Sequence, residues 1–254
     1  QAMTLYEWET AFAAGGKSMA NSRDRREARY QRRRAQRGQK AQEAGGASFD
    51  EVMSFGNLCR AGKECCNGAR WKTSTINFET NLLAESLKTY NDLHDGTRKF
   101  HGFRSFATVE HGKRRDIDAL PIQERAAQKC LCKNLLTEAY SRSFIYDNSA
   151  SLAGKGMDFQ LDRLKKHLHD HYRKYGTEGG IYQFDFKGYF GSLPHDVIKQ
   201  RARAKIKDDR LYALFCDFVD DFQKMKTADR TAERKHGVGL GSEISQIIAL
   251  DYAS

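Results

Sequence analysis

Ile181-Tyr-Gln-Phe-Asp-Phe-Lys-Gly-Tyr-Phe190 is the stretch of this 254-residue chain that says most about its fold. Side chains alternate in direction along its first six residues, which predicts a strand over 181–186 with Ile181, Gln183 and Asp185 on one face. We expect the aromatic residues of the other face to pack against helices. A carboxylate in an apolar strand is costly unless a partner offsets its charge, and a divalent cation is the expected partner of Asp185. Considered alone, Asp185 is equally compatible with an ordinary acid at a strand end.

The chain is basic, with a formal net charge of +10 and a pI near 9.3. This balance favours a polyanionic partner such as nucleic acid. The charge is concentrated in residues 23–40, where nine Lys and Arg side chains face two acids. This run has helical propensity and almost no apolar residues, so we expect it not to pack on a core. Two interpretations stay open: a solvated or flexible tail, and an arm that binds phosphate backbones through residues such as Arg29 and Arg33.

Several classes of protein are disfavoured by composition. No apolar run approaches the length of about 18 residues needed to cross a membrane, and no basic-then-apolar leader begins the chain. We therefore expect a cytoplasmic protein without membrane partners. The six cysteines form no CxxC pair and have no histidines at zinc-ligand spacing, so we expect free thiols, with Cys130 and Cys132 in the core.

Hydrophobic periodicity predicts an α+β fold, mostly helical, with a small antiparallel sheet. A helical stripe covers residues 74–94. Two short strands, 103–110 and 115–120, flank a basic turn at 111–115, and a helix is expected over 122–137. The remaining signals are a helix after Gly154-Lys-Gly156 with an apolar face, a break at 176–180, a helix start near Pro194, an apolar helix over 211–222, and the glycine-rich turn Gly237-Val-Gly-Leu-Gly-Ser-Glu-Ile-Ser-Gln246 running into another helix.

Taken in order, the motifs resemble the reverse transcriptase family, in the bacterial and phage branch that includes diversity-generating retroelements and retrons. The resemblance covers about residues 71–254. The motifs that carry it are Asp185-Phe-Lys-Gly-Tyr-Phe190 followed by Ser192-Leu-Pro-His-Asp-Val197, the glycine-rich turn ending in Ser-Gln, Lys113-Arg-Arg-Asp-Ile117 followed by Ala119-Leu-Pro-Ile-Gln-Glu-Arg125, Phe144-Ile-Tyr-Asp-Asn148, and Gly154-Lys-Gly156. Each motif is weak by itself, and their shared order is specific.

The resemblance implies a right-hand polymerase with a basic N-terminal arm at 1–47, fingers at 48–180 and a partial palm at 181–254. The implied enzyme is an RNA-directed DNA polymerase, a nucleotidyltransferase in which a primer 3′-hydroxyl attacks the α-phosphate of a dNTP. Its expected partners are an RNA template, a DNA or RNA primer and dNTPs, with no accessory protein identified. Two magnesium ions are the expected cofactors of the complete enzyme.

The resemblance also assigns roles to individual residues. Asp185 becomes a catalytic metal ligand, with the carbonyl oxygen of Phe186 as a second ligand. The ring of Phe190 stands under the incoming sugar, where it would clash with a 2′-hydroxyl and favour deoxynucleotides. A plainer interpretation stays open for both side chains: Asp185 as an ordinary acid at a strand end, and Phe190 as an ordinary core residue.

Two further groups are expected to contact nucleotide or nucleic acid. Cationic side chains in the fingers would grip the triphosphate, and glycine would let the backbone approach the nucleotide closely. The basic residues are equally compatible with a solvated hairpin, and Lys155 with a turn before a helix. The assigned residues are Lys113, Arg114 and Arg115 for the triphosphate, Gly241, Ser242 and Gln246 for the nucleotide and template, and Lys155 for nucleic acid.

The chain also departs from the family pattern. Gly191 replaces an acid that many relatives carry, and Gly239 replaces a proline. The second acidic motif, Tyr-x-Asp-Asp, is absent from the sequence; Asp251 precedes a tyrosine but falls on an expected helix. We therefore expect an N-terminal fragment that is inactive by itself. A non-catalytic RNA-binding or maturase-like module is the main alternative, and a template-independent defence polymerase is a further one.

Overall fold

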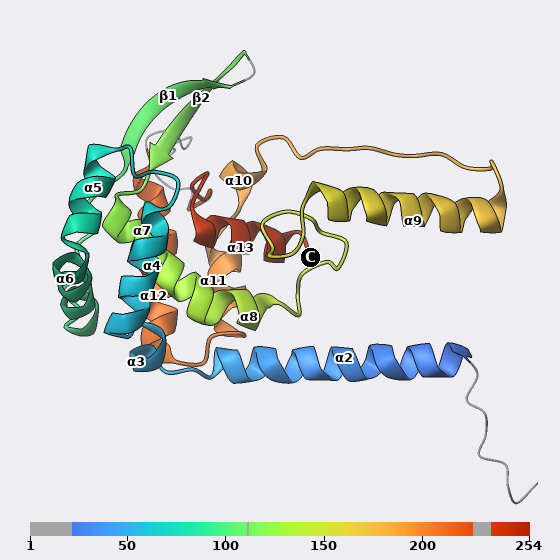
Figure 1. Ribbon diagram of the computed structural model, residues 1–254, viewed down its shortest axis with the longest axis horizontal. Helices are drawn as coiled ribbons and strands as arrows, with labels where there is room; N and C mark the ends of the chain where they lie inside the picture. Colours follow the sequence, from blue (N-terminus) through green and yellow to red (C-terminus); the bar gives the residue numbers. More distant parts are fainter. Residues whose placement is uncertain (1–21, 111, 226–234) are drawn as a thin grey trace, which may run out of the picture. The chain divides into compact units, whose positions relative to one another are not determined.

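The computed structural model describes residues 22–110, 112–225 and 235–254, and the chain divides into two compact units, 1–39 and 40–254. Within the described residues the fold is mostly helical with one two-stranded antiparallel sheet (Figure 1). The expected α+β class is confirmed at this level. The division of residues 48–254 into fingers and palm stays a prediction. Among the described helices, none is long and apolar enough for a membrane span.

The elements follow one another with short connections in most places. In chain order the described elements are α2 (Ser22–Gly45), α3 (Phe49–Val52), α4 (Phe55–Cys66), α5 (Thr73–Thr80), α6 (Leu82–His94), β1 (Arg104–Glu110), β2 (Lys113–Ala119), α7 (Ile122–Leu131), a π-helical turn (Cys132–Leu136), α8 (Thr137–Tyr140), α9 (Met157–Tyr175), α10 (Tyr189–Ser192), α11 (His195–Arg203), α12 (Asp209–Asp221) with a 3-10 turn (Phe222–Lys224), and α13 (Glu243–Tyr252).

The first unit contains the basic run, which is helical as its composition indicated. Residues 25–37 belong to α2 and are all exposed, including Arg29 and Arg33. Gln31 donates a 2.7 Å hydrogen bond to Glu27 one turn earlier. Because the helix presents guanidinium groups rather than apolar residues, it is held by its own backbone bonds and by such local pairs.

The core of the second unit forms around the continuous helical rod of α7, the π-turn and α8. Leu131, Leu135 and Leu136 of this rod are fully buried. Helices α4, α6 and α13 contact the rod, and α12 contributes Phe215 and Phe218 to the same cluster (Figure 1). Burying these side chains is the main source of stability for the unit.

Local signals fix where the helices begin. Ser48 and Glu51 form a reciprocal capping box at α3, and Asp208 caps α12 by accepting a 2.9 Å hydrogen bond from the amide of Leu211. The same Asp208 carboxylate accepts a 3.1 Å bond from the amide of Phe49, which joins the starts of two helices far apart in the sequence. The stripe expected over 74–94 is helical but interrupted at Asn81, and several of its apolar side chains are exposed.

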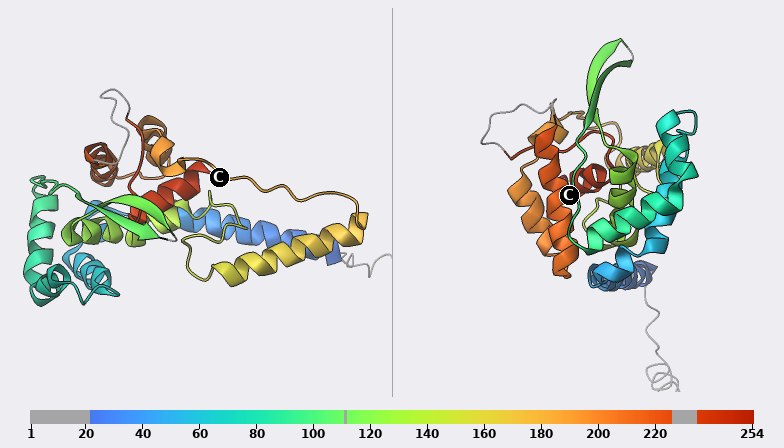
Figure 2. Two further views of the ribbon diagram at one scale, coloured as in Figure 1. Left: turned by 90° about the horizontal axis from the view of Figure 1, so that it is seen from above. Right: turned by 90° about the vertical axis from the view of Figure 1, so that its left-hand side faces the viewer.

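The expected hairpin is present, with β1 and β2 paired in antiparallel register from Arg104↔Ala119 to Glu110↔Lys113. In Figure 1 and in the right-hand view of Figure 2 it extends away from the helices. The sequence had placed the basic residues in the turn. Lys113, Arg114 and Arg115 instead belong to strand β2. A two-residue connection with Gly112 at a φ of 76° explains this difference, because such tight turns favour glycine.

The strand predicted over 181–186 is wrong. These residues form no regular element, and residues 181–188 are all exposed, including Tyr182 at 93% and Phe184 at 80%. A strand is stable only when a neighbour pairs with its backbone groups, and within the described residues the one sheet consists of β1 and β2. Side-chain alternation cannot report whether that neighbour exists. The expected packing of the aromatic face against helices is wrong for the same reason.

Helix α9 follows Gly154-Lys-Gly156 and ends at Gly176, as predicted. Its apolar face is not covered, since no residue of α9 is buried and Leu161, Leu164 and Leu168 are each nearly half exposed. In contrast, α12 and α13 bury the apolar positions that predicted them, and α11, predicted from the start signal at Pro194, buries Ile198 and Ala202.

Candidate functional site

A pocket of about 310 Å³ lies where three segments far apart in the sequence meet. It is lined by residues of strand β2, of the turn into α10, and of the segment that leads to α13. The lining residues are Ile117, Asp118, Gly188, Tyr189, Phe190, Gly191, Met225, Gly237, Val238 and Leu240. The pocket therefore brings Phe190 beside part of the glycine-rich segment and strand β2. Gly241, Ser242 and Gln246, which the sequence assigned to the nucleotide and template, are not among its lining residues.

The first wall is the turn that presents Phe190. Gly188 adopts a left-handed conformation with a φ of 65° and caps α10, which a residue with a Cβ would resist. The hydroxyl of Tyr189 donates a 2.7 Å hydrogen bond to the carbonyl oxygen of Ala249 on α13. Burial raises the pKa of Tyr189. With its neighbour anchored in this way, the half-buried Phe190 ring is fixed at the pocket.

The second wall is the segment Gly237–Leu240, which runs beside the residues after Phe190. The amide of Val238 donates to the carbonyl oxygen of Phe190 at 2.9 Å, and that of Gly237 donates to Leu193 at 2.8 Å. Gly237 has a φ of 91°, and a Cβ at this position would lie 3.2 Å from the carbonyl oxygen of Gly191. The close approach of the two segments thus depends on glycine.

His195, the first residue of α11, holds the second wall of the pocket through two hydrogen bonds and does not itself line the pocket. Its amide donates a 2.9 Å bond to the carbonyl oxygen of Lys235, and its ring Nε2 lies 2.7 Å from the carbonyl oxygen of Gly237. The side chain is buried, and burial lowers its pKa. Sequence patterns gave no reason to select His195, because both of its partners lie far away in the chain.

The third wall is β2. Asp118 is buried and its carboxylate accepts a hydrogen bond from the hydroxyl of Ser105 on β1. Among the described lining residues it is the single acidic side chain, and most of the others are apolar. Such a lining suits a flat, largely uncharged group better than a phosphate.

The residues assigned to the triphosphate precede Ile117 on the same strand. Arg114 is exposed, whereas the side chains of Lys113 and Arg115 lie outside what the structure describes. The pocket lining does not include these three residues. Their assignment stays a prediction.

Asp185 and Phe186 lie in the exposed segment before Gly188 and do not line the pocket. Within the described residues no group of three or more His, Cys, Asp or Glu side chains could hold a metal ion. One carboxylate and one carbonyl oxygen are an incomplete set for two magnesium ions, each of which needs several oxygen ligands. The residues present therefore do not fit the two-ion site by themselves, and no chemical step is assigned to it.

The residues after Leu240 differ in their placement. Gly241 is exposed with a φ of 83°, and Gln246 is half-buried in α13. Ser242 is buried, and its hydroxyl donates a 2.5 Å hydrogen bond to the side-chain oxygen of Gln128 on α7. Its side chain thus joins α13 to α7 and is not directed at a ligand. Gln128 lies in a helix with many polar residues, so no sequence pattern pointed to this contact.

Lys155 is also engaged within the fold. Its ammonium donates a 2.5 Å hydrogen bond to the carbonyl oxygen of Tyr146 and lies about 5 Å from the ring centres of Tyr146 and Phe159. These contacts hold the loop before α9 in place. A role of Lys155 in binding nucleic acid stays a prediction.

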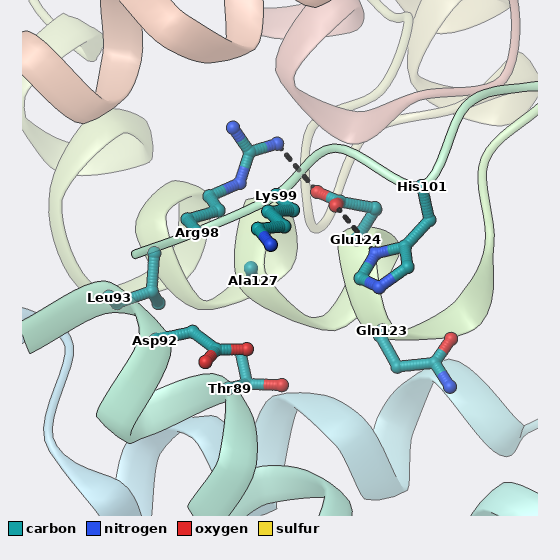
Figure 3. Close-up of a pocket in the computed structure, with 9 residues that line it drawn as sticks. All are labelled: Thr89, Asp92, Leu93, Arg98, Lys99, His101, Gln123, Glu124 and Ala127. Carbon is teal, nitrogen blue, oxygen red and sulfur yellow. Dashed lines mark hydrogen bonds and ion pairs between the residues drawn. The ribbon is translucent and has the colours of Figure 1, made fainter. Parts of the chain in front are cut away.

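A buried ionic cluster, not foreseen from the sequence, braces the segment that leads into β1 (Figure 3). One guanidinium nitrogen of Arg98 lies 2.6 Å from carboxylate oxygens of both Glu124 on α7 and Asp221 on α12. Figure 3 shows Arg98 and His101 on either side of Glu124, around a small cavity of about 30 Å³. All three charged groups of the cluster are largely buried, so we assign it a structural role in joining α7, α12 and the hairpin.

A scan against models of protein families and a search of curated proteins each found no match to the chain.

Proposed function

We propose that the pocket beside Phe190 receives the sugar and base of a deoxynucleoside triphosphate, in the fingers and first part of the palm of an RNA-directed DNA polymerase. One observation carries this proposal: Phe190, the glycine-rich segment and strand β2 line one pocket. The motifs that resemble reverse transcriptases place the incoming nucleotide among these same three segments.

The size and lining of the pocket support a nucleoside as the ligand. Its volume of about 310 Å³ lies at the lower end of the range of about 300–1,000 Å³ typical of small-molecule sites. A nucleoside has a flat base and a compact sugar that suit apolar walls. We assign the triphosphate to Lys113, Arg114 and Arg115, because cationic side chains bind phosphate oxygens.

Phe190 supplies the selectivity in this proposal. A rigid ring beside the sugar leaves no room for a 2′-hydroxyl, so deoxynucleotides are favoured over ribonucleotides. The hydrogen bond from Val238 to the Phe190 carbonyl oxygen and the anchor of Tyr189 on Ala249 limit how far the ring can retreat.

Photolabelling of the chain with 8-azido-dATP tests the location of the site. We expect covalent labelling within peptides that contain residues 188–191 or 237–240, and we expect an excess of dATP to suppress it. Labelling confined to other regions, such as α9, or labelling that dATP does not suppress, would exclude the proposed pocket.

A second function, RNA binding without catalysis, is favoured by a separate observation. Residues 25–37 of α2 present a row of exposed arginines, which suits the phosphate backbone of RNA in a sequence-independent manner. The two proposals are compatible, since a polymerase must also hold its template. RNA binding that persists when photolabelling fails would favour the binding module over the enzyme.

A further inference from the structure

His195 makes two hydrogen bonds to the segment 235–237, which is distant from it in the sequence. Its amide donates to Lys235 at 2.9 Å, and its ring faces the carbonyl oxygen of Gly237 at 2.7 Å. An isolated bridge between Pro194 and His236 lies between these two contacts. His195 therefore holds the carbonyl oxygens of Lys235 and Gly237, and Gly237 directly precedes Val238, the residue bonded to Phe190.

The contact with Gly237 determines the state of the ring. A carbonyl oxygen can only accept a hydrogen bond, so Nε2 must carry the proton. The other nitrogen, Nδ1, is buried and has no hydrogen-bond partner among the residues that the structure describes. A proton on Nδ1 would place an unsatisfied donor and a positive charge in the interior, so the ring is neutral with its proton on Nε2.

We propose that His195 is a positioning residue that holds the glycine-rich wall of the pocket in place through its buried neutral ring, so that acidification favours an open state in which the charged ring reaches water and this wall is released. The assignment of the pocket to a nucleotide rests on the proposed function. The hold on residues 235–238 does not, because it follows from the hydrogen bonds alone.

Release of Gly237 would reach the pocket directly. Gly237 and Val238 both line it, and the amide of Val238 is the group bonded to the Phe190 carbonyl oxygen. A shift of this segment would therefore change the wall beside the Phe190 ring. His195 itself does not line the pocket, which distinguishes a positioning role from contact with a ligand.

Charged neighbours do not offset the cost of protonating His195. The hydrogen bond to the Gly237 carbonyl oxygen favours the imidazolium, because Nε2–H donates in both states. Asp220 on α12 also favours it, but its carboxylate is paired at 2.7 Å with Lys199 on α11. Lys199 and the adjacent His236 disfavour the charged ring, and burial is the largest influence of all. The ring thus has a lower pKa in the folded chain than in the unfolded chain. Its contribution to stability is complete above the unfolded value near 6.5 and is lost as the pH falls through the folded value.

Amide hydrogen exchange of peptides spanning residues 235–241, corrected for intrinsic rates, tests this inference without any nucleotide. We expect the protection of the Gly237 and Val238 amides to fall by up to about tenfold per pH unit as the pH drops below 6.5, and to level off below the lower pKa of the folded ring. His195→Gln keeps a side-chain donor that does not titrate, so protection should persist at low pH. His195→Phe removes the donor, and protection should be low at every pH. The exposed neighbour provides the control: His236→Gln removes a group that disfavours the charged ring, so the acid transition should remain and move at most slightly to higher pH.

Two outcomes would overturn the inference: protection of Gly237 and Val238 that does not change between pH 8 and pH 5, or an acid transition that survives in His195→Gln. If His195→Phe does not fold, an NMR titration of the His195 ring nitrogens in the original chain replaces it; a proton on Nδ1 at neutral pH would also refute the proposal. A parallel titration with dTTP separates the two claims. Absence of dTTP binding at every pH would count against the proposed function, while the exchange result would still decide the role of His195.

Discussion

The amide of Val238 donates a 2.9 Å hydrogen bond to the carbonyl oxygen of Phe190, which joins the glycine-rich segment to the turn that presents the Phe190 ring. These two residues line the same pocket. Because one backbone hydrogen bond joins the two segments, the shape of the pocket depends on the residues outside it that pack against either segment. This dependence gives residues outside the pocket, such as Gly237 and His195, a measurable influence on it.

Replacing Gly237 with alanine should destabilise the second unit. The residue has a φ of 91°, which costs an L-residue about 1–2 kcal/mol, and the new Cβ would lie 3.2 Å from the Gly191 carbonyl oxygen. Urea unfolding measures the change in the free energy of unfolding. Gly241 is a matched control, because it also has a positive φ of 83° but a Cβ there has open space. An equal loss in Gly241→Ala and Gly237→Ala would show that the close approach contributes nothing.

Removing the Arg98 guanidinium should be among the most damaging single changes. Arg98→Met removes the shared partner of the buried Glu124 and Asp221 carboxylates, although Lys224 stays 2.9 Å from Asp221. Breaking a buried pair in this way typically costs about 3–5 kcal/mol. Arg70→Met is the control, since it breaks a surface pair with Glu79 and should cost less than about 1 kcal/mol. Thermal unfolding of both variants decides the matter. Similar losses would mean that the cluster around Arg98 behaves as an ordinary surface pair.

Thiol chemistry should report the core directly. Burial raises the pKa of Cys65 to about 11 and that of Cys130 to about 12, and it raises that of Cys132 as well. Because the thiolate is the reactive form, these cysteines should resist iodoacetamide at pH 8 until the chain unfolds. Cys59 is half-buried and should react first. Peptide mapping by mass spectrometry gives the order, and early labelling of Cys130 would contradict the packing of α7 described above.

The arginines of α2 should contribute a salt-dependent affinity for RNA. Replacing Arg29, Arg32 and Arg33 with glutamine removes three exposed charges and should flatten the dependence of log Kd on log salt by about 0.7 per contact with single-stranded RNA. The matched lysine variant keeps the charges and should retain the slope. Fluorescence anisotropy with a labelled RNA across a salt series gives both values. An unchanged slope in the glutamine variant would identify α2 as a solvated helix without a role in binding.

Local patterns predicted the parts of the fold that depend on neighbouring residues. The apolar positions of α12, the proline before α11 and the two strands of the hairpin are each determined within a few residues. The segment 181–186 shows the limit, because its alternation is real but a strand also requires a pairing partner that sequence patterns do not reveal. The apolar face of α9 shows the same limit for helix packing.

The candidate site was likewise predicted only in part: the motifs identified some of its residues but not the contacts that hold them. Phe190 and the glycine-rich segment were selected from their motifs, and the pocket brings them together. The contacts that support them were missed, since Ser242 with Gln128 and His195 with Gly237 are pairs far apart in the chain. Gln128 and His195 both lie in helices rich in polar residues, so local patterns single out neither the contact nor the partner.

The affinity ratio for dTTP over UTP, measured for the original chain and for Phe190→Ala, tests the central claim most directly, and Tyr182→Ala serves as the control because its ring is 93% exposed and outside the pocket. We predict that the original chain and Tyr182→Ala bind dTTP more tightly than UTP, and that Phe190→Ala loses most of this preference by gaining affinity for UTP. An unchanged preference in Phe190→Ala, or no binding of dTTP to the original chain, would contradict the account.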